Sequence, residues 1–165
     1  MTIPNWLPPL VYFNDYKGDW SIYIEAVYEY FKIDFIENTV FYKGIRISIP
    51  KHPLFLGKET KFWHVTSEGE EEDERIPDFR RCERIRWIKP IIENSNDPAI
   101  KCWENKRKSD RRICLFLEQE NYLVVLAIRN DYILLCTAYL VDRYHQQQKL
   151  LREYEAYKRR VPPSS

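Results

Sequence analysis

Four apolar segments separated by short polar turns, all within residues 99–141, constrain the fold more than any other feature of the sequence. They are Ile100–Glu104, Arg111–Glu118, Tyr122–Ile128 and Tyr132–Val141. Their Ile, Val, Leu, Tyr and Phe residues favour strands, and turns this short join antiparallel neighbours. The sequence therefore predicts a four-stranded antiparallel meander. The last two segments are apolar on both faces, which predicts central strands in a sheet covered on both sides.

Three helices are expected around this meander. Trp20–Phe35 carries apolar residues at spacings of three and four, and Asp19 precedes it as a candidate N-cap. Ile76–Trp87 is expected to be a helix that Pro77 opens and that ends before Pro90. Arg143–Arg160 has an apolar stripe and a basic last turn, which predicts a terminal helix.

Two further strands are expected before the meander. Val40–Ile49 alternates around Gly44 and predicts a strand that is bent or bulged at the glycine. Lys58–Ser67 is the second candidate strand and runs into an acidic loop, Glu68–Glu74. Residues 1–16 contain three prolines and are expected to form an extended arm. The predicted fold class is α+β: an N-terminal helix, then a twisted antiparallel sheet with the meander, packed by helices including a C-terminal one.

Length and cysteine content limit the class of protein. A chain of 165 residues fits one domain with its own core, residues 1–165. We find no apolar stretch long enough to cross a membrane and no secretory signal, so a cytoplasmic location is expected. The four cysteines form no CxxC pair and have no histidine cluster at zinc spacing, which predicts reduced thiols in the core. The alternative of a catalytic thiol near His64 has no supporting motif but is left open by the sequence. We expect no metal and no cofactor.

The net charge of +1 conceals an asymmetry along the chain. Residues 1–74 hold 7 Lys and Arg against 13 Asp and Glu, whereas residues 75–165 hold 19 against 12. A concentrated basic surface suits a phosphate-backbone partner such as RNA. It equally suits a solvated surface whose charges are paired within the molecule. Charge alone leaves both interpretations open.

Chemistry-bearing side chains stand at three places in the sequence. His64 ends a candidate strand, and a histidine can give or take a proton near pH 7. Four arginines crowd the Ile76–Trp87 segment, and guanidinium groups bind phosphate oxygens in a fork. Thr137 and Tyr139 are two apart in the last strand, so their hydroxyls share a face. Each signal also has an ordinary structural explanation: a surface histidine, arginines paired with nearby glutamates, and residues that favour strands. The arginines are Arg80, Arg81, Arg84 and Arg86.

Taken together, these residues predict a ribonuclease that needs no metal ion. Cleavage through the ribose 2′-hydroxyl requires a proton acceptor, a proton donor and positive charge beside the phosphorane. A histidine, arginines and a hydroxyl pair on one sheet face supply all of these.

The order of elements resembles the barnase–EndoU–colicin–RelE superfamily of RNases, in its phage and toxin branch. The resemblance rests on a histidine-bearing strand, an Arg-rich helix, and a meander that ends in Leu-Leu-Cys-Thr-Ala-Tyr before a helix. It covers roughly residues 60–157, so residues 59–160 would form the RNase-like core and 1–58 an extension. It implies metal-independent cleavage of RNA on the sheet face.

The resemblance also implies roles for individual residues. His64 would be the general acid or base, Arg81 or Arg84 would stabilise the phosphorane, and Thr137 and Tyr139 would hold the polar position of the last strand. Four basic residues are expected to contact RNA: Arg80, Lys101, Arg111 and Arg112. The substrate would be tRNA or mRNA, and a toxin of this kind would have an antitoxin protein as its partner. The alternative is a non-catalytic RNA- or protein-binding module of phage origin.

Overall fold

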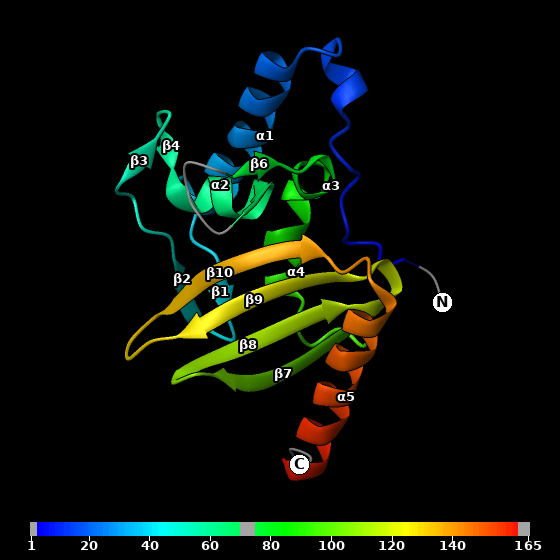
Figure 1. Cartoon of the computed structure of the whole chain (residues 1–165). Coiled ribbons are helices and arrows are strands. Elements are labelled where there is room, and N and C mark those ends of the chain that lie inside the picture. Colours follow the sequence, from blue (N-terminus) through cyan, green and yellow to red (C-terminus); the bar gives the residue numbers. More distant parts are fainter. Residues whose placement is uncertain (1–2, 70–74, 162–165) are drawn as a thin grey trace.

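The computed structural model describes residues 3–69 and 75–161. The predicted meander is present as β7 (Ile100–Arg107), β8 (Asp110–Leu117), β9 (Tyr122–Ile128) and β10 (Ile133–Leu140). Consecutive strands pair antiparallel throughout. A 3-10 turn, η4 (Glu118–Glu120), connects β8 to β9. The fold class is therefore confirmed as α+β, with the curled sheet at the centre of the molecule (Figure 1).

The sheet has six strands in the order β1-β2-β10-β9-β8-β7, which makes β10 and β9 its central pair. The prediction of one bent strand over Val40–Ile49 is wrong. The segment forms a hairpin of β1 (Phe41–Tyr42) and β2 (Ile45–Ser48). Lys43 and Gly44 both have positive φ, 47° and 83°, as a two-residue hairpin turn requires. β2 then pairs parallel with β10, so the sheet is mixed.

The two long helices are where the sequence predicts them. α1 (Trp20–Phe35) is capped by Asp19, whose side chain accepts a hydrogen bond from the Ile22 backbone N–H. The helix is preceded by an extended arm and a 3-10 turn, η1 (Phe13–Tyr16). α5 (Tyr144–Arg160) packs on the sheet face shown toward the viewer in Figure 1, while α4 (Ile88–Glu93) lies behind the sheet.

The strand predicted over Lys58–Ser67 is wrong, and His64 lies on a helix instead. A short hairpin, β3 (Leu54–Phe55) and β4 (Lys58–Glu59), leads directly into α2 (Thr60–Thr66). Phe62, Val65 and Thr66 are buried at helical spacing. The Phe62 ring packs 5.4 Å from that of Phe31 on α1. Because seven residues are too few to separate a period of 2 from one of 3.6, packing against α1 decides the structure.

The single helix predicted over Ile76–Trp87 is also wrong. Ile76–Pro77 is a strand, β6, paired with β5 (Ser67–Glu68), and Asp78 caps α3 (Phe79–Glu83) through a bond from the Arg80 N–H. A 3-10 turn, η3 (Ile85–Trp87), then leads into α4. Pro90 is the third residue of α4, where its missing N–H has no intrahelical partner to lose. Residues 70–74 of the expected acidic loop lie outside the described residues.

Two apolar clusters hold the sheet from its two faces. The larger lies under α1, α3 and α4 and includes Tyr23, Phe31, Ile88, Leu115 and Leu135. The smaller lies under α5, where Leu150, Leu151 and Tyr154 pack against Trp103 and Phe116. Because α5 covers only part of this second face, a groove remains beside it. No helix in the described part of the chain combines the length and apolarity needed to span a bilayer.

Candidate active site

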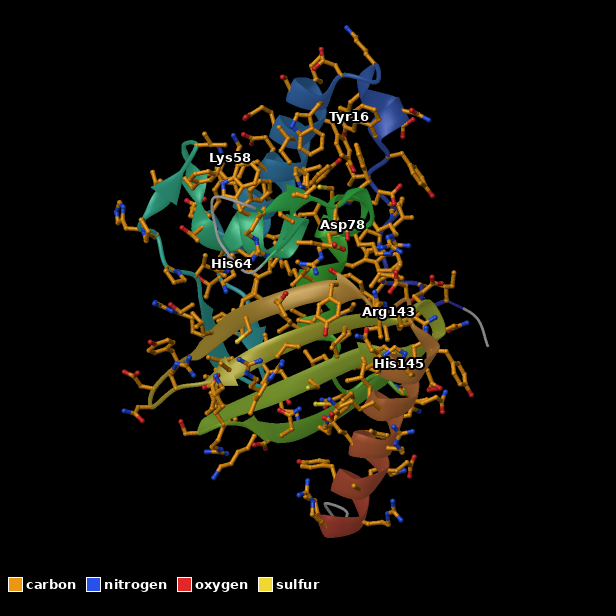
Figure 2. The ribbon with its side chains drawn as sticks, in the orientation of Figure 1. Tyr16, Lys58, His64, Asp78, Arg143 and His145 are labelled. Atoms are coloured by element: carbon orange, nitrogen blue, oxygen red, sulfur yellow. The ribbon has the colours of Figure 1, made fainter. Side chains whose placement is uncertain are left out.

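Two side chains of α2 face the central strand β10. Lys61 and His64 are one helical turn apart, with Lys61 Nζ 3.5 Å from His64 Nδ1. Lys61 Nζ also donates to the backbone carbonyl of Cys136, at 2.8 Å. Burial lowers the pKa of Lys61, and the positive charges of Arg75 and Arg112 lower it further. The Lys61 ammonium group thus joins α2 to the strand that carries Thr137 and Tyr139, and the His64 imidazole lies beside that ammonium group. Figure 2 labels His64 on α2, next to β10.

Arg81 connects the end of α2 to the same strand. From α3, its Nη1 donates to the carbonyls of Ser67, at 2.7 Å, and His64, at 3.2 Å. Its guanidinium carbon lies 5.3 Å from the centre of the Tyr139 ring, a cation–π distance. Arg75 donates to the same two carbonyls, at 2.8 and 3.1 Å. Both arginines satisfy backbone carbonyls at the end of α2, and Arg81 places positive charge beside Tyr139.

A β-bulge at Cys136 places Thr137 and Tyr139 on the face of the sheet that α5 partly covers. The register with β9 shifts between Leu135 and Thr137. Leu135 and Ala138 belong to the main core, whereas Tyr139 packs against the cluster under α5. The pairing of Thr137 with Val125 puts both on that second face. The expectation that Thr137 and Tyr139 share a face agrees with this register.

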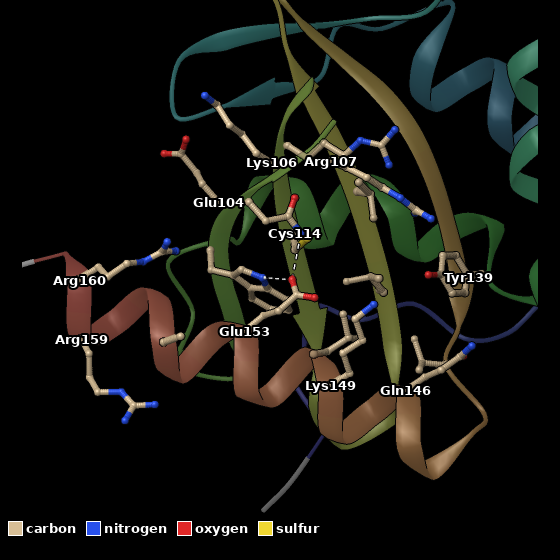
Figure 3. A pocket seen from close by; sticks show the side chains of 18 residues that line it. Glu104, Lys106, Arg107, Cys114, Tyr139, Gln146, Lys149, Glu153, Arg159 and Arg160 are labelled. Carbon is tan, nitrogen blue, oxygen red and sulfur yellow. Dashed lines mark hydrogen bonds between the residues drawn. The ribbon is translucent and has the colours of Figure 1, made fainter. Parts of the chain in front are cut away.

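Burial raises the pKa of the Tyr139 hydroxyl, and the charges of Arg81 and Arg107 oppose this shift. The phenol therefore stays protonated at neutral pH and can donate a hydrogen bond. Tyr139 also lines a groove of about 950 Å³ between the sheet and α5, which we call the α5 groove (Figure 3). Six cationic residues line it: Lys106, Arg107, Arg112, Lys149, Arg159 and Arg160. Glu104 and Glu153 are its two carboxylates.

Of the five residues predicted to be catalytic, Arg81 contacts both the backbone carbonyl of His64 and the Tyr139 ring, and Thr137 shares the sheet face of Tyr139. Arg84 lies elsewhere. Its guanidinium packs 5.2 Å from the ring of Trp87 and donates to the Arg80 carbonyl at 3.0 Å. Arg84 therefore supports the packing of η3 and the N-terminal arm, since Trp87 in turn donates to the Pro8 carbonyl at 2.8 Å.

The residues predicted to bind RNA are spread over the molecule. Arg112 lines the α5 groove, and its Nε donates to Asp110 at 3.2 Å. Lys101 pairs with Glu118 at 3.2 Å and lies over Tyr154, also under α5. Arg80 pairs with Asp142 at 2.9 Å, beyond the end of β10. Arg111 pairs with Glu104 at 3.1 Å, and its strand partner Lys106 is likewise exposed.

Lys61, Arg75 and Glu153 were missed by the sequence analysis. Lys61 stands three residues before His64, a spacing that puts both on one face only if the segment is helical. The strand prediction hid that signal. Across residues 3–69 and 75–161, no group of three or more His, Cys, Asp or Glu side chains has the geometry to hold a metal ion. The four cysteines are free thiols, and burial raises the pKa of each.

Comparisons with protein-family models, with curated proteins and with solved structures found no match to this chain.

Proposed function

We propose that the protein is a toxin-like endoribonuclease that cleaves RNA without a metal ion, at the site formed by α2, α3 and β10. The observation that supports this most directly is that Lys61 and Arg81 both contact the strand that carries Tyr139, with the His64 imidazole beside Lys61. These residues supply a proton acceptor, a proton donor and positive charge within one small region. The fold class agrees with the superfamily that the sequence resembles, although no comparison identifies that family.

The proposed reaction begins at the ribose. The imidazole of His64 takes the 2′-hydroxyl proton while O2′ attacks phosphorus, and the P–O5′ bond breaks as the departing oxygen takes a proton from the Lys61 ammonium group, whose pKa burial lowers. The Tyr139 hydroxyl is a donor to the phosphorane oxygens, and Arg81 and Lys61 offset its negative charge. The products are a 2′,3′-cyclic phosphate and a 5′-hydroxyl. The proposed substrate is tRNA or mRNA, and the proposed location is the cytoplasm. An antitoxin protein would be the partner that covers the cations of the α5 groove.

The test is incubation of the purified full-length chain with total RNA in excess EDTA. We expect fragments that end in 2′,3′-cyclic phosphate from the wild type and intact RNA from His64→Ala. His145→Ala is the matched control, because His145 is exposed at the start of α5, away from this site (Figure 2). Equal cleavage by His64→Ala would remove His64 from the mechanism. Cleavage that EDTA abolishes would contradict the metal-free reaction.

The same geometry supports a second candidate, a non-catalytic RNA-binding module. Arg81 Nη1 is already committed to two backbone carbonyls, which is a structural role. The α5 groove and its cations exist whether or not the site is catalytic. In this case RNA stays intact in every sample, while Arg112→Ala lowers RNA affinity and the salt dependence of binding.

A further inference from the structure

The hairpin of β3 and β4 exposes three consecutive apolar side chains, which we call the hairpin tip. They are Leu54, Phe55 and Leu56, and they are 50%, 39% and 72% exposed. Figure 1 shows this hairpin projecting from the body of the molecule, away from the six-stranded sheet. Single exposed apolar residues are ordinary on a protein surface, whereas a contiguous group of them marks an interaction site.

Leu56 stands where the backbone favours a different residue type. Leu56 and Gly57 form the two-residue turn between the paired residues Phe55 and Lys58, with φ values of 53° and 78°. A turn with two positive φ values favours Asn-Gly, because asparagine tolerates the left-handed region far better than a bulky apolar residue does. Among residues 3–69 and 75–161, Leu56 is the one apolar side chain on a non-glycine residue with positive φ. A leucine held at the end of the hairpin against this local preference is expected where its side chain has a function.

The base of the hairpin is fixed to α2, so the tip is presented on a firm support. The indole N–H of Trp63 donates to the Phe55 carbonyl at 2.8 Å, and the two rings pack edge to face with their centres 6.2 Å apart. The Thr60 hydroxyl donates to the Pro53 carbonyl, also at 2.8 Å. These contacts engage the inner side of the hairpin and leave the tip exposed to solvent.

The charge next to the tip is positive. Residues 50–58 contain no Asp or Glu, and their basic residues are Lys51, His52 and Lys58. Lys58 pairs with Glu25 on α1, which leaves Lys51 as an exposed cation beside the tip. Glu59, the carboxylate that follows, is buried. Apolar side chains beside a cation suit the surface of an anionic bilayer, where the apolar groups enter the acyl boundary and the cation meets the headgroups.

The size of the tip favours a lipid surface over a protein partner. A stable protein interface buries roughly 800 Å² on each partner. Three side chains around a two-residue turn supply a small part of this area, whereas insertion into a bilayer needs no complementary surface. We infer that the β3–β4 hairpin docks the protein on membranes, by inserting the tip into the interface of an anionic phospholipid bilayer. Docking of this kind goes beyond the proposed action on RNA and does not depend on it.

Flotation of the full-length protein with phospholipid vesicles tests the docking. One set of vesicles is phosphatidylcholine alone, and the other is an equal mixture of phosphatidylcholine and phosphatidylglycerol. The wild type should float with the mixed vesicles and much less with phosphatidylcholine alone, because attraction of the cation adds to insertion of the apolar side chains. Wild-type protein that fails to float with the mixed vesicles would overturn the inference and favour a protein partner for the tip. Equal flotation with both sets would overturn the choice of an anionic surface.

Leu56→Asn removes the most exposed side chain of the tip and keeps the turn. Because Asn-Gly is a favoured sequence for this turn, urea unfolding should show a stability equal to or above that of the wild type. The affinity for mixed vesicles should nevertheless fall roughly tenfold or more. Tyr144→Asn is the matched control, since Tyr144 is 73% exposed in the first turn of α5 and should not contribute to binding. Figure 2 shows Arg143 and His145, its neighbours in the sequence, on the opposite side of the molecule from Lys58.

Two further outcomes would contradict the inference. Equal affinity of Leu56→Asn and the wild type would assign the attraction to other cations, such as those of the α5 groove. A loss in Tyr144→Asn as large as that in Leu56→Asn would show that the tip has no special part. Lys51→Gln should lower the affinity for mixed vesicles roughly fivefold, and an unchanged affinity would argue against an anionic surface. Because no RNA is present, these measurements are independent of whether the protein is a nuclease.

Discussion

One residue in β10 decides which side chains face the α5 groove. Without the bulge at Cys136, strict alternation from Ile133 and Leu135 would turn Thr137 and Tyr139 toward the main core. The bulge reverses the alternation, so Ala138 takes the core position. The sequence shows that Thr137 and Tyr139 share a face, because that follows from their spacing. Which face they share depends on the bulge, and no residue in Leu-Leu-Cys-Thr-Ala is of a type that predicts a bulge there.

Tyr139→Phe separates the two roles of this residue. Phenylalanine keeps a ring for Arg81 to pack on and removes only the hydroxyl that would donate to the phosphorane. If the proposed reaction is correct, kcat should fall by roughly a hundredfold, while urea unfolding shows little change in stability. Tyr132→Phe, at an exposed turn residue, is the control and should be fully active. Full activity of Tyr139→Phe would show that its hydroxyl takes no part in the reaction.

Asp34 on α1 makes a second prediction at this scale. Burial raises its pKa to about 6, against the opposing charges of Lys89 and Arg86. Since the folded state favours the protonated form, this carboxyl lowers stability as the pH rises from about 4 to 6. Asp34→Asn should therefore raise the free energy of unfolding at pH 7 by roughly 1–3 kcal/mol. Urea unfolding at pH 7 and pH 4 measures this.

The gain from Asp34→Asn should shrink toward pH 4, because the carboxyl is then protonated in the folded state and the pH is close to its unfolded pKa of 3.8. Glu37→Gln, at an exposed position just beyond the same helix, should change stability little at either pH. An equal gain at both pH values would mean that the charge of Asp34 is not the cause.

At the scale of elements, long helices and strands could be predicted and short ones could not. α1 and α5 have 16 and 17 residues, enough turns for a period of 3.6 to be distinct. α2 has seven residues, and α3 has five. In segments this short, contacts with α1 and β10 decide the structure rather than local preference. The error at α2 affected the candidate site most, because it concealed that Lys61 lies beside His64.

The two long helices differ in how they begin. The Asp19 side chain caps α1, whereas Arg143 precedes α5 and makes no capping bond. Asp19→Ala should lower the free energy of unfolding by about 1 kcal/mol, and Arg143→Ser should raise it by a similar amount. Urea unfolding of both variants beside the wild type tests this. A loss of stability in Arg143→Ser would mean that the arginine makes contacts that outweigh a new cap.

At the scale of the whole molecule, the sequence of the meander was enough to predict the fold class but not the candidate site. The spacing of strands in residues 99–141 predicts an antiparallel meander with β9 and β10 at the centre of the sheet, because this pairing joins segments that are close in the sequence. The site joins α2, α3, β10 and α5 over distances in sequence that no single pattern spans. Glu153 illustrates the difference. In the sequence, Glu153 is one of several charged residues on a helix expected to face solvent. Only the folded structure shows that Trp103 and Asn105 donate hydrogen bonds to it.

The same burial that forms the two cores should make the whole protein sensitive to alkali. Burial raises the pKa of Cys82 and of Cys114 from 9.0 to about 12, and it also raises the pKa of Tyr23, Tyr42 and Tyr122. A raised pKa stabilises the fold below the unfolded value, and this stability is lost as the pH rises toward the folded value. Lys61 acts in the opposite sense in this range, but it is one group against several.

We therefore expect the free energy of unfolding to be nearly constant from pH 7 to 8.5 and to fall above pH 9. Each buried thiol contributes a slope of about 1.4 kcal/mol per pH unit, so a domain of ordinary stability should unfold near pH 11. Urea unfolding under reducing conditions from pH 7 to 10.5 measures the slope. Cys82→Ser removes one titrating group, and its curve should fall less steeply than that of the wild type. Parallel curves for the two proteins would show that Cys82 ionises as readily in the folded state as in the unfolded chain, which the full burial of this α3 residue argues against.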